Sequence, residues 1–600
     1  MARIVGWTES ERKQLPGING PHIQLGQTIF SSYASAPQQL VENNLMLVCD
    51  GYFYNCPEEY SNPLLWLHFL YREYGFEGML QKINGDFAIA LYDEENQITY
   101  LARDRVGLKP LYHTTIANTL AFASQPDVLL NFPGVDCRLN TSFVSRFAAS
   151  HYRLIDNERE NSPYAAISQL PAATYLQFKS GKSTVKTYWQ LNNFNNLEGD
   201  ENLLAEQYKE LLLEAVNCRM KVASKPAFTL SGGMDSSSVL ASAVYLSGNK
   251  QQAFSTVYED KTFDESDEIE TILKDTVEKW HPVTISSPDV LGLVKEMVAL
   301  HGEPVATATW LSHHLLCKEV SNRGFKSLFG GLGGDELNAG EYEHFFYNFA
   351  DIAYEGDTKR WDKELSFWSK YHDHPLYKKN KRTLQETLNR VVDPTISGKC
   401  LVDRERMMRY SSALNKDYFD LPSYQPLMSS PSSSYLKNRT FQDIFWETAP
   451  CCLRAEDRQC SASGLDNFLP FYDYRLLEFM FRIPGHLKIR DGVTKYLLRQ
   501  AMKDILPEET RGRIKKTGWN APAHVWFSGK GLEPLKDMIH SQKFRQRGIY
   551  DVGEVESLLQ EHDDIISNNQ LKENHMMFFW QLINLELWCE HLEAQHSLAL

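Results

Sequence analysis

The sequence lacks the features that are typical of secreted, membrane-spanning or zinc-binding proteins. Its 10 cysteines are scattered, and only Cys451 and Cys452 are adjacent. Because there is no Cys-x-x-Cys pair, the spacing predicts neither a zinc site nor a disulfide framework. No apolar run is long enough to span a membrane, and the N-terminal segment is too short and too polar for a signal peptide. We therefore expect a soluble, cytoplasmic protein without a membrane partner.

The chain also has fewer basic residues than acidic residues. The chain carries 62 Lys and Arg residues against 77 Asp and Glu residues, which gives a net charge of −15. This balance argues against nucleic acid as the main partner. With 42% hydrophobic residues the composition is globular, but 600 residues are too many for a single core. We expect roughly two or three domains.

Residues 1–195 alternate short β-type runs with turn residues, which predicts a first domain rich in strands. The candidate strands are residues 45–49, 87–92, 98–102, 121–123 and 174–178. The polar stretch 192–200 is typical of a linker. It leads to a second domain, which we place at residues 203–600.

The first part of the second domain has a different order of predicted elements. Strand candidates alternate there with helical segments, at residues 227–230, 253–257, 281–285 and 326–330. This alternation is the pattern of a doubly wound α/β fold with a parallel sheet. Residues 341–440 form an aromatic-rich insert that we expect to be irregular, and helices return from about 441. The apolar tail 576–592 has helical spacing, so we expect it to pack against the body.

A glycine-rich turn follows the first strand candidate of that domain, with the sequence Thr229-Leu230-Ser231-Gly232-Gly233-Met234-Asp235-Ser236-Ser237-Ser238. Such a turn lets backbone N–H groups and the Ser231 and Ser236 hydroxyls close around an oxyanion at the start of a helix. It lacks the lysine of a Walker loop, so it is not the motif for transferring a γ-phosphate. The turn resembles the pyrophosphate loop of enzymes that split ATP into AMP and pyrophosphate. The alternative is an ordinary strand-to-helix turn.

A second glycine-rich turn follows the strand candidate at 326–330, with the sequence Gly330-Gly331-Leu332-Gly333-Gly334-Asp335-Glu336. The carboxyl ends of neighbouring parallel strands share one edge of a sheet, so Asp235 and Asp335 would lie close together. Two carboxylates there would hold the Mg²⁺ of a triphosphate. The alternative is that the acidic pair caps a helix N-terminus. The presence of both loops favours the metal site.

Basic residues form a third group. Lys495 and Arg499 are four residues apart, which predicts that they share one helix face. Further cations follow at Arg511, Arg513, Lys515 and Lys516. A departing pyrophosphate and an anionic tetrahedral intermediate both need positive charge. The alternative is a solvated basic surface.

The order of these motifs resembles that of the class B asparagine synthetases. Residues 205–530 resemble the synthetase domain of that family, which has an ATP-pyrophosphatase (adenine nucleotide α-hydrolase-like) fold. Further matching segments are Glu456-Asp457-Arg458, Pro470-Phe471-Tyr472-Asp473, Lys495-Tyr496-Leu497-Leu498-Arg499 and Lys515-Lys516-Thr517-Gly518. The resemblance implies ATP and Mg²⁺ as cofactors, with Asp235 and Asp335 as metal ligands. It implies that Lys495 and Asp335 are catalytic and that Lys495 stabilises the tetrahedral intermediate.

The same resemblance implies a nucleotide-binding set. Its members are Ser231, Gly232, Gly233, Asp235, Ser236, Ser237, Val257, Gly331 and Lys516.

The N-terminal region resembles the family's glutaminase domain, an Ntn-hydrolase sandwich of αββα layers. The similarity rests on residues 50–55, 83–88 and 102–112. In the family a cysteine after Met1 hydrolyses glutamine, but this chain has Ala2 there, so the nucleophile is missing. Tyr52 also replaces the glutamate that holds the substrate ammonium.

The family's downstream Asp-Ser/Thr-Glu element, which also holds glutamine, has no clear counterpart near residues 62–65. These departures predict a glutaminase fold without glutaminase activity. The resemblance implies a structural role for residues 103–111, because that segment packs the sheet in the family.

Another departure lies in the second glycine loop. Leu332 stands where the family has an acidic residue on the acceptor side of the site, and an apolar side chain cannot deprotonate an amine. Either another group does so or the acceptor differs. The candidate bases are Glu303, His301 and Glu341, in that order.

These features predict an ATP-dependent amide ligase that adenylates a carboxylate and joins it to an amine. Without glutamine hydrolysis, an intramolecular amine is the economical source. Two branches of the family that resemble this chain use an intramolecular amine. They are the β-lactam synthetases and the lasso-peptide macrolactam cyclases. The large insert favours a peptide or another bulky substrate. For a lasso cyclase, a leader-binding protein and a protease would be partners.

Three alternatives stay open. The first is an asparagine synthetase that uses free ammonia, and the second is a non-catalytic scaffold. A tRNA-modifying relative is the least favoured, because neither a basic surface nor paired cysteines are present.

Overall fold

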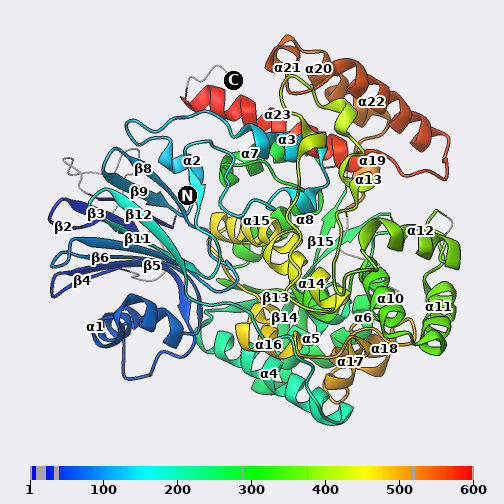
Figure 1. Cartoon of the computed structure of the whole chain (residues 1–600), viewed down its shortest axis with the longest axis horizontal. Helices are drawn as coiled ribbons and strands as arrows, with labels where there is room; N and C mark the ends of the chain where they lie inside the picture. Colours follow the sequence, from blue (N-terminus) through cyan, green and yellow to red (C-terminus); the bar gives the residue numbers. More distant parts are fainter. Residues whose placement is uncertain are drawn as a thin grey trace.

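The computed structural model describes residues 3–8, 22–32, 39–260, 262–286, 288–374, 376–514 and 521–596. Within these ranges the chain forms two six-stranded sheets and one five-stranded sheet. Figure 1 shows the two larger sheets stacked on one side of the molecule and the smaller sheet among helices at its centre. In the described ranges no helix is long and apolar enough to cross a membrane.

Both six-stranded sheets are antiparallel. The first has the order β10-β8-β9-β1-β3-β2, built from β1 (Ile4–Trp7), β2 (Ile23–Leu25), β3 (Thr28–Ser32), β8 (Tyr112–Ile116), β9 (Thr119–Ala123) and β10 (Ser168–Gln169). The second has the order β12-β11-β7-β6-β5-β4, built from β4 (Gln39–Glu42), β5 (Leu45–Phe53), β6 (Gly85–Asp93), β7 (Ile98–Arg103), β11 (Thr174–Lys179) and β12 (Lys182–Thr187). All the strands predicted for this region are confirmed.

Neighbouring side chains along the strands of this region belong to two different hydrophobic cores. Leu47 and Ile89 belong to a core shared with α1 (Pro63–Lys82), whereas their neighbours Met46 and Ala88 belong to the core between the two sheets. Successive side chains of a strand point to opposite faces, so one strand serves both cores. The outer face of the first sheet packs near α2 (Pro126–Leu129), α3 (Thr141–Ala149) and the short η1 (Tyr152–Leu154). The predicted αββα layering is therefore present.

The five-stranded sheet is parallel and has the order β15-β14-β13-β16-β17. Its strands are β13 (Pro226–Thr229), β14 (Gln251–Tyr258), β15 (Val277–Ile285), β16 (Ser327–Phe329) and β17 (Asp466–Phe468). Helix α4 (Glu201–Val222) precedes the first of these strands, and the helices that follow it are α5 (Met234–Ser247), α6 (Ser266–Thr276), α7 (Val290–His301), α8 (Thr309–Asn322) and α9 (Gly334–Asn338). The alternation predicted for this part of the chain is confirmed.

The strand order places the two glycine-rich turns side by side. The chain runs outward from β13 through β14 and β15, then returns to the other side of β13 with β16. Ligands of open α/β sheets bind at such a reversal, beyond the carboxyl ends of the strands. The turns after β13 and β16 both lie at this edge.

The prediction that residues 341–440 are irregular is wrong for the first half of the insert. That half forms α10 (His344–Glu355), α11 (Thr358–His372) and α12 (Lys381–Val391). Phe345, Phe349 and Trp368 are buried in a core of these helices, so the aromatic residues build a helical layer of their own. The second half is more irregular and holds the short α13 (Arg404–Met407), η2 (Ser411–Ala413) and η3 (Leu421–Ser423).

The remaining chain is mainly helical. Its elements are α14 (Tyr435–Phe445), α15 (Thr448–Ala462), η4 (Pro470–Tyr472), α16 (Tyr474–Met480), η5 (Gly485–Leu487), α17 (Tyr496–Ala501), α18 (Glu508–Gly512), α19 (Ala523–Trp526), η6 (Gly529–Leu532), α20 (Glu533–His540), α21 (Gln542–Arg547), α22 (Val552–Ser567) and α23 (Met576–His596).

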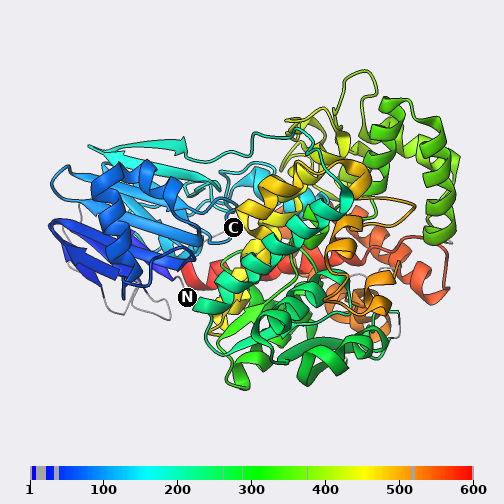
Figure 2. The ribbon, with the colours of Figure 1, turned by 90° about the horizontal axis from the view of Figure 1, so that it is seen from below.

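The last helix contacts both the N-terminal sandwich and the second domain. Figure 2 shows α23 extending from the α20–α22 region towards the N-terminal sandwich. Trp580 of this helix donates to the Val305 carbonyl at 2.8 Å, and Gln581 donates to the Phe147 carbonyl of α3 at 2.8 Å. The predicted packing of the apolar tail against the body is confirmed.

Candidate active site

The candidate site begins at the carboxyl end of β13, where the chain turns into α5. The Ser231 N–H donates to Ser236 Oγ at 3.1 Å, and the two hydroxyl oxygens lie 3.0 Å apart. Gly232 adopts a φ of 67°, which glycine tolerates and most residues do not. The loop thus folds back onto the first turn of α5. Its hydroxyls and backbone N–H groups lie at a helix N-terminus, an environment suited to phosphate oxygens.

The second glycine loop packs directly against the first. A Cβ atom at Gly331 would lie 2.5 Å from the backbone nitrogen of Ser236, so only glycine fits this contact. Asp335 lies in the first turn of α9, whose N-cap is Gly333. The acidic pair is therefore not the N-cap itself, but both residues lie in the first turn of α9, where the helix dipole favours carboxylates. The two loops form one continuous surface.

Lys495 joins the two loops through its ammonium group. Its Nζ lies 2.5 Å from Asp235 Oδ2 and 2.8 Å from Asp335 Oδ1. The residue is only 6% exposed, which excludes a solvated surface lysine. The position between the two carboxylates thus already favours positive charge, and carboxylate oxygens are ligands that Mg²⁺ prefers. Asp235 and Asp335 fit a magnesium site on these grounds.

Lys495 reaches this position from an unusual backbone conformation. It adopts the left-handed region, with φ 57° and ψ 32°, immediately before α17. Arg499 lies within α17 and donates to the carbonyl groups of Arg511 and Arg513 at 2.5 and 2.7 Å. The prediction that Lys495 and Arg499 share a helix face is therefore wrong. A non-glycine residue in the left-handed region costs about 1–3 kcal/mol and persists where its surroundings hold it.

Helix α11 of the insert holds the turn that precedes Lys495. The buried Glu364 carboxylate accepts hydrogen bonds from the backbone N–H groups of Asp491 and Gly492, at 2.7 and 2.9 Å. His372 Nε2 of the same helix lies 2.7 Å from the Gly492 carbonyl oxygen. Burial raises the pKa of Glu364. The insert thus helps to position the lysine that lies between the two loops.

The other predicted nucleotide-binding residues lie at varying places around the loops. Val257 is half-buried near the carboxyl end of β14, beside β13. Ser237 is fully buried within α5. Arg513 donates to the Gly232 carbonyl at 2.8 Å, so a guanidinium borders the first loop. Lys516, together with Lys515, lies outside the described residues.

Two of the three proposed bases lie beside arginines, and the third, His301, is buried. Glu303 Oε1 accepts a hydrogen bond from Arg454 Nε at 2.7 Å, and His301 and Glu303 line a small interior cavity with that arginine. Burial first, and then the Arg458 charge, lowers the pKa of His301 well below its ordinary value. Glu341 Oε2 lies 3.7 Å from Arg153 Nη2. The carboxylates of Glu303 and Glu341 therefore both lie beside arginines.

Glu336 is a functional candidate that sequence reasoning passed over. It follows Asp335 in α9 and is 5% exposed. Burial, and after it the charges of Asp335 and Glu341, raises the pKa of Glu336 to about 8. A buried carboxyl that titrates near neutrality suits proton transfer. The acidic pair was visible in the sequence, but the burial that distinguishes its second member was not.

The N-terminal positions that depart from the glutaminase pattern contact the second domain. Arg3 Nη1 lies 3.3 Å from Asp50 Oδ1 and 2.9 Å from Asp466 Oδ1. The Tyr52 hydroxyl donates to Asp466 Oδ2 at 2.7 Å, and its ring lies 5.3 Å from that of Phe468 in β17. Asp50 and Tyr52 are thus part of an interdomain contact. Ala2 lies outside the described residues.

The segment 103–111 has a structural arrangement, as predicted. The Asp104 carboxylate accepts hydrogen bonds from the backbone N–H groups of four residues, Val106, Gly107, Leu108 and Lys109. The Lys109 ammonium in turn lies 2.7 Å from Asp457 Oδ1 of α15, and both groups are buried. The segment therefore shapes a loop and also joins the sandwich to the second domain.

Comparison with known proteins places the chain in a family. Residues 207–590 match asparagine synthase, and residues 66–189 match the glutamine amidotransferase domain. The chain is 27% identical over 532 residues to glutamine-hydrolyzing asparagine synthetase 1 of Bacillus subtilis (strain 168), which covers 86% of this chain and 80% of the relative. It is 24% identical over 595 residues to amidase chyE of Penicillium rubens, covering 88% and 85%.

The chain belongs to the asparagine synthase family. It is therefore an ATP-dependent carbon–nitrogen ligase.

Proposed function

We propose that this ligase activates a carboxylate with ATP and transfers the acyl group to an amine without hydrolysing glutamine. The observation that carries the proposal is the Lys495 ammonium, which lies between Asp235 and Asp335 beside the phosphate-type loop. A buried cation at this point supports a site in which two substrates and a triphosphate would meet.

The first step forms an acyl-adenylate. A carboxylate oxygen of the substrate attacks the α-phosphorus of ATP, and the bond to pyrophosphate breaks. Ser231, Ser236 and the backbone N–H groups of the first loop would hold the departing pyrophosphate, and Arg513 lies beside them. Asp235 and Asp335 would hold Mg²⁺, which supplies charge neutralisation to the triphosphate.

The second step transfers the acyl group. The amine nitrogen attacks the acyl carbon, an oxyanion develops, and the carbon–oxygen bond to AMP then breaks. Lys495 would turn its flexible stem from the carboxylates towards this oxyanion and stabilise it. Glu336 would take the proton that the amine loses, because its raised pKa lies near the operating range of a general base. We assign the role of base to Glu336 rather than to Glu303, because Glu303 is paired with Arg454.

Loss of glutamine hydrolysis is supported by Ala2 and by the contacts of Arg3 and Tyr52 with Asp466 of the second domain. The amine must then come from elsewhere. An amine on the same substrate molecule gains the advantage of proximity, and closing a ring forms a lactam. We propose a peptide substrate and a macrolactam product, as in lasso-peptide cyclases. A leader-binding protein and a protease would be the partners in that case.

The Bacillus subtilis relative is a glutamine-hydrolyzing asparagine synthetase, which favours an asparagine synthetase as a second candidate. In this chain it would use free ammonia, with aspartate as the carboxylate. The two candidates share the adenylation step and differ in the amine.

One experiment separates them. The purified chain is incubated with ATP and Mg²⁺, and AMP release is measured with aspartate plus ammonium or with linear peptides encoded beside its gene. Peptide-dependent AMP release with loss of one water from the peptide mass supports the cyclase. Asparagine formation supports the second candidate, and no AMP release with any carboxylate would remove the catalytic proposal.

A further inference from the structure

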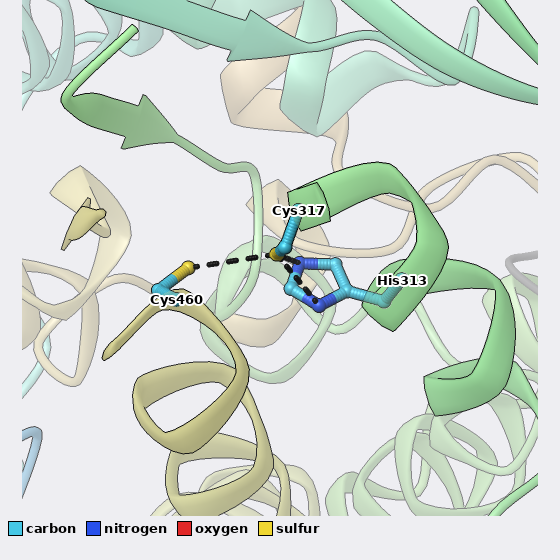
Figure 3. A group of neighbouring side chains, drawn as sticks. All are labelled: His313, Cys317 and Cys460. Atoms are coloured by element: carbon cyan, nitrogen blue, oxygen red, sulfur yellow. Dashed lines mark hydrogen bonds between the residues drawn. The ribbon is translucent and has the colours of Figure 1, made fainter. Parts of the chain in front are cut away.

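Two helices of the second domain each present a pair of metal-binding side chains to the other. His313 and Cys317 are one turn apart on α8, and Glu456 and Cys460 are one turn apart on α15. Residues four apart lie on the same face of a helix. Figure 3 shows the His313 ring and the Cys317 and Cys460 sulfurs turned towards one another. All four residues are buried, and the two cysteines are not exposed at all.

Three of these residues are as close to one another as the ligands of a metal site, because one ligand atom from each of His313, Cys317 and Cys460 lies within 4.8 Å of the other two. The Cys317 and Cys460 sulfurs lie 3.9 Å apart, and the Cys317 sulfur lies 3.6 and 3.8 Å from the two His313 ring nitrogens. Glu456 Oε2 lies 3.0 Å from His313 Nε2. Tetrahedral zinc with ordinary bond lengths separates two sulfurs by about 3.8 Å, sulfur from nitrogen by about 3.6 Å and nitrogen from oxygen by about 3.3 Å. The observed spacings differ from these by only a few tenths of an ångström.

A hydrogen bond behind the ring orients His313 for such a role. Gln459 Nε2 donates to the Trp310 carbonyl at 2.9 Å, which turns the amide oxygen of Gln459 towards His313. That oxygen lies 2.7 Å from His313 Nδ1, so Nδ1 carries the hydrogen and donates. Nε2 is left as the nitrogen that faces Glu456. Histidine ligands of metals commonly donate their second nitrogen to a carbonyl in this way.

We propose that His313, Cys317 and Cys460 form a structural zinc site that joins α8 to α15, with the neighbouring Glu456 side chain turning in as the fourth ligand. Four ligands without access for substrate are typical of structural zinc. The proposal does not depend on the ligase mechanism. The site would fasten α15, which also carries Asp457 of the interdomain contact, to the helical layer beside the parallel sheet.

The test is the metal content of the full chain, purified under reducing conditions from cells grown with added zinc. We expect about one zinc per chain and at least a tenfold lower content in Cys317→Ser and Cys460→Ser. Cys400→Ser is the matched control, because Cys400 is buried in the insert away from this cluster, and it should keep its zinc. Zinc well below one tenth of an equivalent in the wild-type chain overturns the proposal.

A second measurement covers variants that fail to fold. The wild-type chain is stripped of zinc with a chelator and loaded with Co²⁺, whose tetrahedral thiolate complexes absorb strongly in the visible and near-ultraviolet range. We expect that spectrum, and zinc should abolish it. A wild-type chain without the tetrahedral spectrum, or peptide mapping that finds Cys317 and Cys460 joined as a disulfide in the native protein, contradicts the proposal.

Discussion

Lys495 Nζ lies 2.5 Å from Asp235 Oδ2, although the two residues are 260 positions apart in the chain. The contact joins the loop after β13 to the turn before α17, and Asp335 completes it from the loop after β16. Three separate segments therefore place one cation and two carboxylates at a single point.

Asp235→Asn and Asp335→Asn should each abolish adenylation. Each substitution removes a carboxylate that would bind Mg²⁺, and the triphosphate needs charge neutralisation for the α-phosphorus to be attacked. We expect ATP–pyrophosphate exchange to fall by at least about 100-fold, with partial recovery at high Mg²⁺. The exposed Glu270→Gln is the control and should behave as wild type. Normal exchange in either Asn variant at ordinary Mg²⁺ concentrations would show that the two carboxylates do not share a metal.

Glu336→Gln should spare adenylation and slow acyl transfer by about 10²–10⁴-fold, the usual contribution of a general base. The pKa of Glu336 is about 8, so the wild-type rate of acyl transfer should rise with pH through that value as the carboxylate forms. The variant should lack this rise. The exposed Glu355→Gln serves as the control. A variant that keeps the wild-type pH profile of product formation would exclude Glu336 as the base.

The same residue predicts a pH dependence of stability. In the unfolded chain Glu336 has its ordinary pKa of 4.5, whereas in the folded chain the pKa is about 8. Between these values the folded chain holds a proton that the unfolded chain has released. The Glu336 contribution to the free energy of unfolding therefore falls as pH rises across this window. Denaturant unfolding at several pH values should show a shallower fall in Glu336→Gln than in the wild type, and equal slopes would contradict the assignment.

Glu364→Ala should weaken the ligase without changing its affinity for ATP. The carboxylate accepts two backbone hydrogen bonds that hold the turn before Lys495, and hydrogen bonds to a charged group contribute about 1.5–3 kcal/mol each. With the turn released, Lys495 would leave its left-handed conformation, and we expect product formation to fall by about tenfold or more. Asp362→Asn, two residues earlier in the same helix and exposed, is the control. Unchanged product formation in Glu364→Ala would mean that the insert does not position the lysine.

The chain should release no glutamate from glutamine above the rate without enzyme. Ala2 offers no nucleophile, and Tyr52 donates to Asp466 where the family has the glutamate that holds the substrate. Ala2→Cys alone should therefore not restore hydrolysis. A coupled glutamate assay on the wild type and on this variant tests both statements. Glutamate release by the wild type would overturn the proposed loss of function.

Much of the fold was predictable because its signals are local. Short β-type runs between turn residues revealed β5, β6 and β7, and the alternation of strands and helices after residue 203 revealed most of the parallel sheet. The exception is β17, which has only three residues and is contributed far along the chain from β16. The helices of the insert were missed because their aromatic residues pack on one another rather than on the main core.

The candidate site was predictable in its members but not in its contacts. Both glycine loops carry signals in sequence, and parallel strand ends must share an edge. Nothing local shows that Lys495 adopts a left-handed conformation or that Glu336 is buried. The contact of Arg3 with Asp466 spans 463 positions, and the Cys317–Cys460 approach spans 143, so neither has a spacing signature.

The most direct test of the account is Lys495→Ala, measured in two assays on the same preparation. A preorganised cation facing a developing oxyanion contributes about 3–4 kcal/mol, or 10²–10³-fold in rate. We predict that ATP affinity stays within a few-fold of wild type, while product formation, or AMP release where the substrate is unknown, falls by that factor. Lys495→Arg should also be poor, because a planar guanidinium does not replace a compact ammonium. The exposed Lys503→Ala should be normal. Wild-type product formation in Lys495→Ala would contradict the central claim.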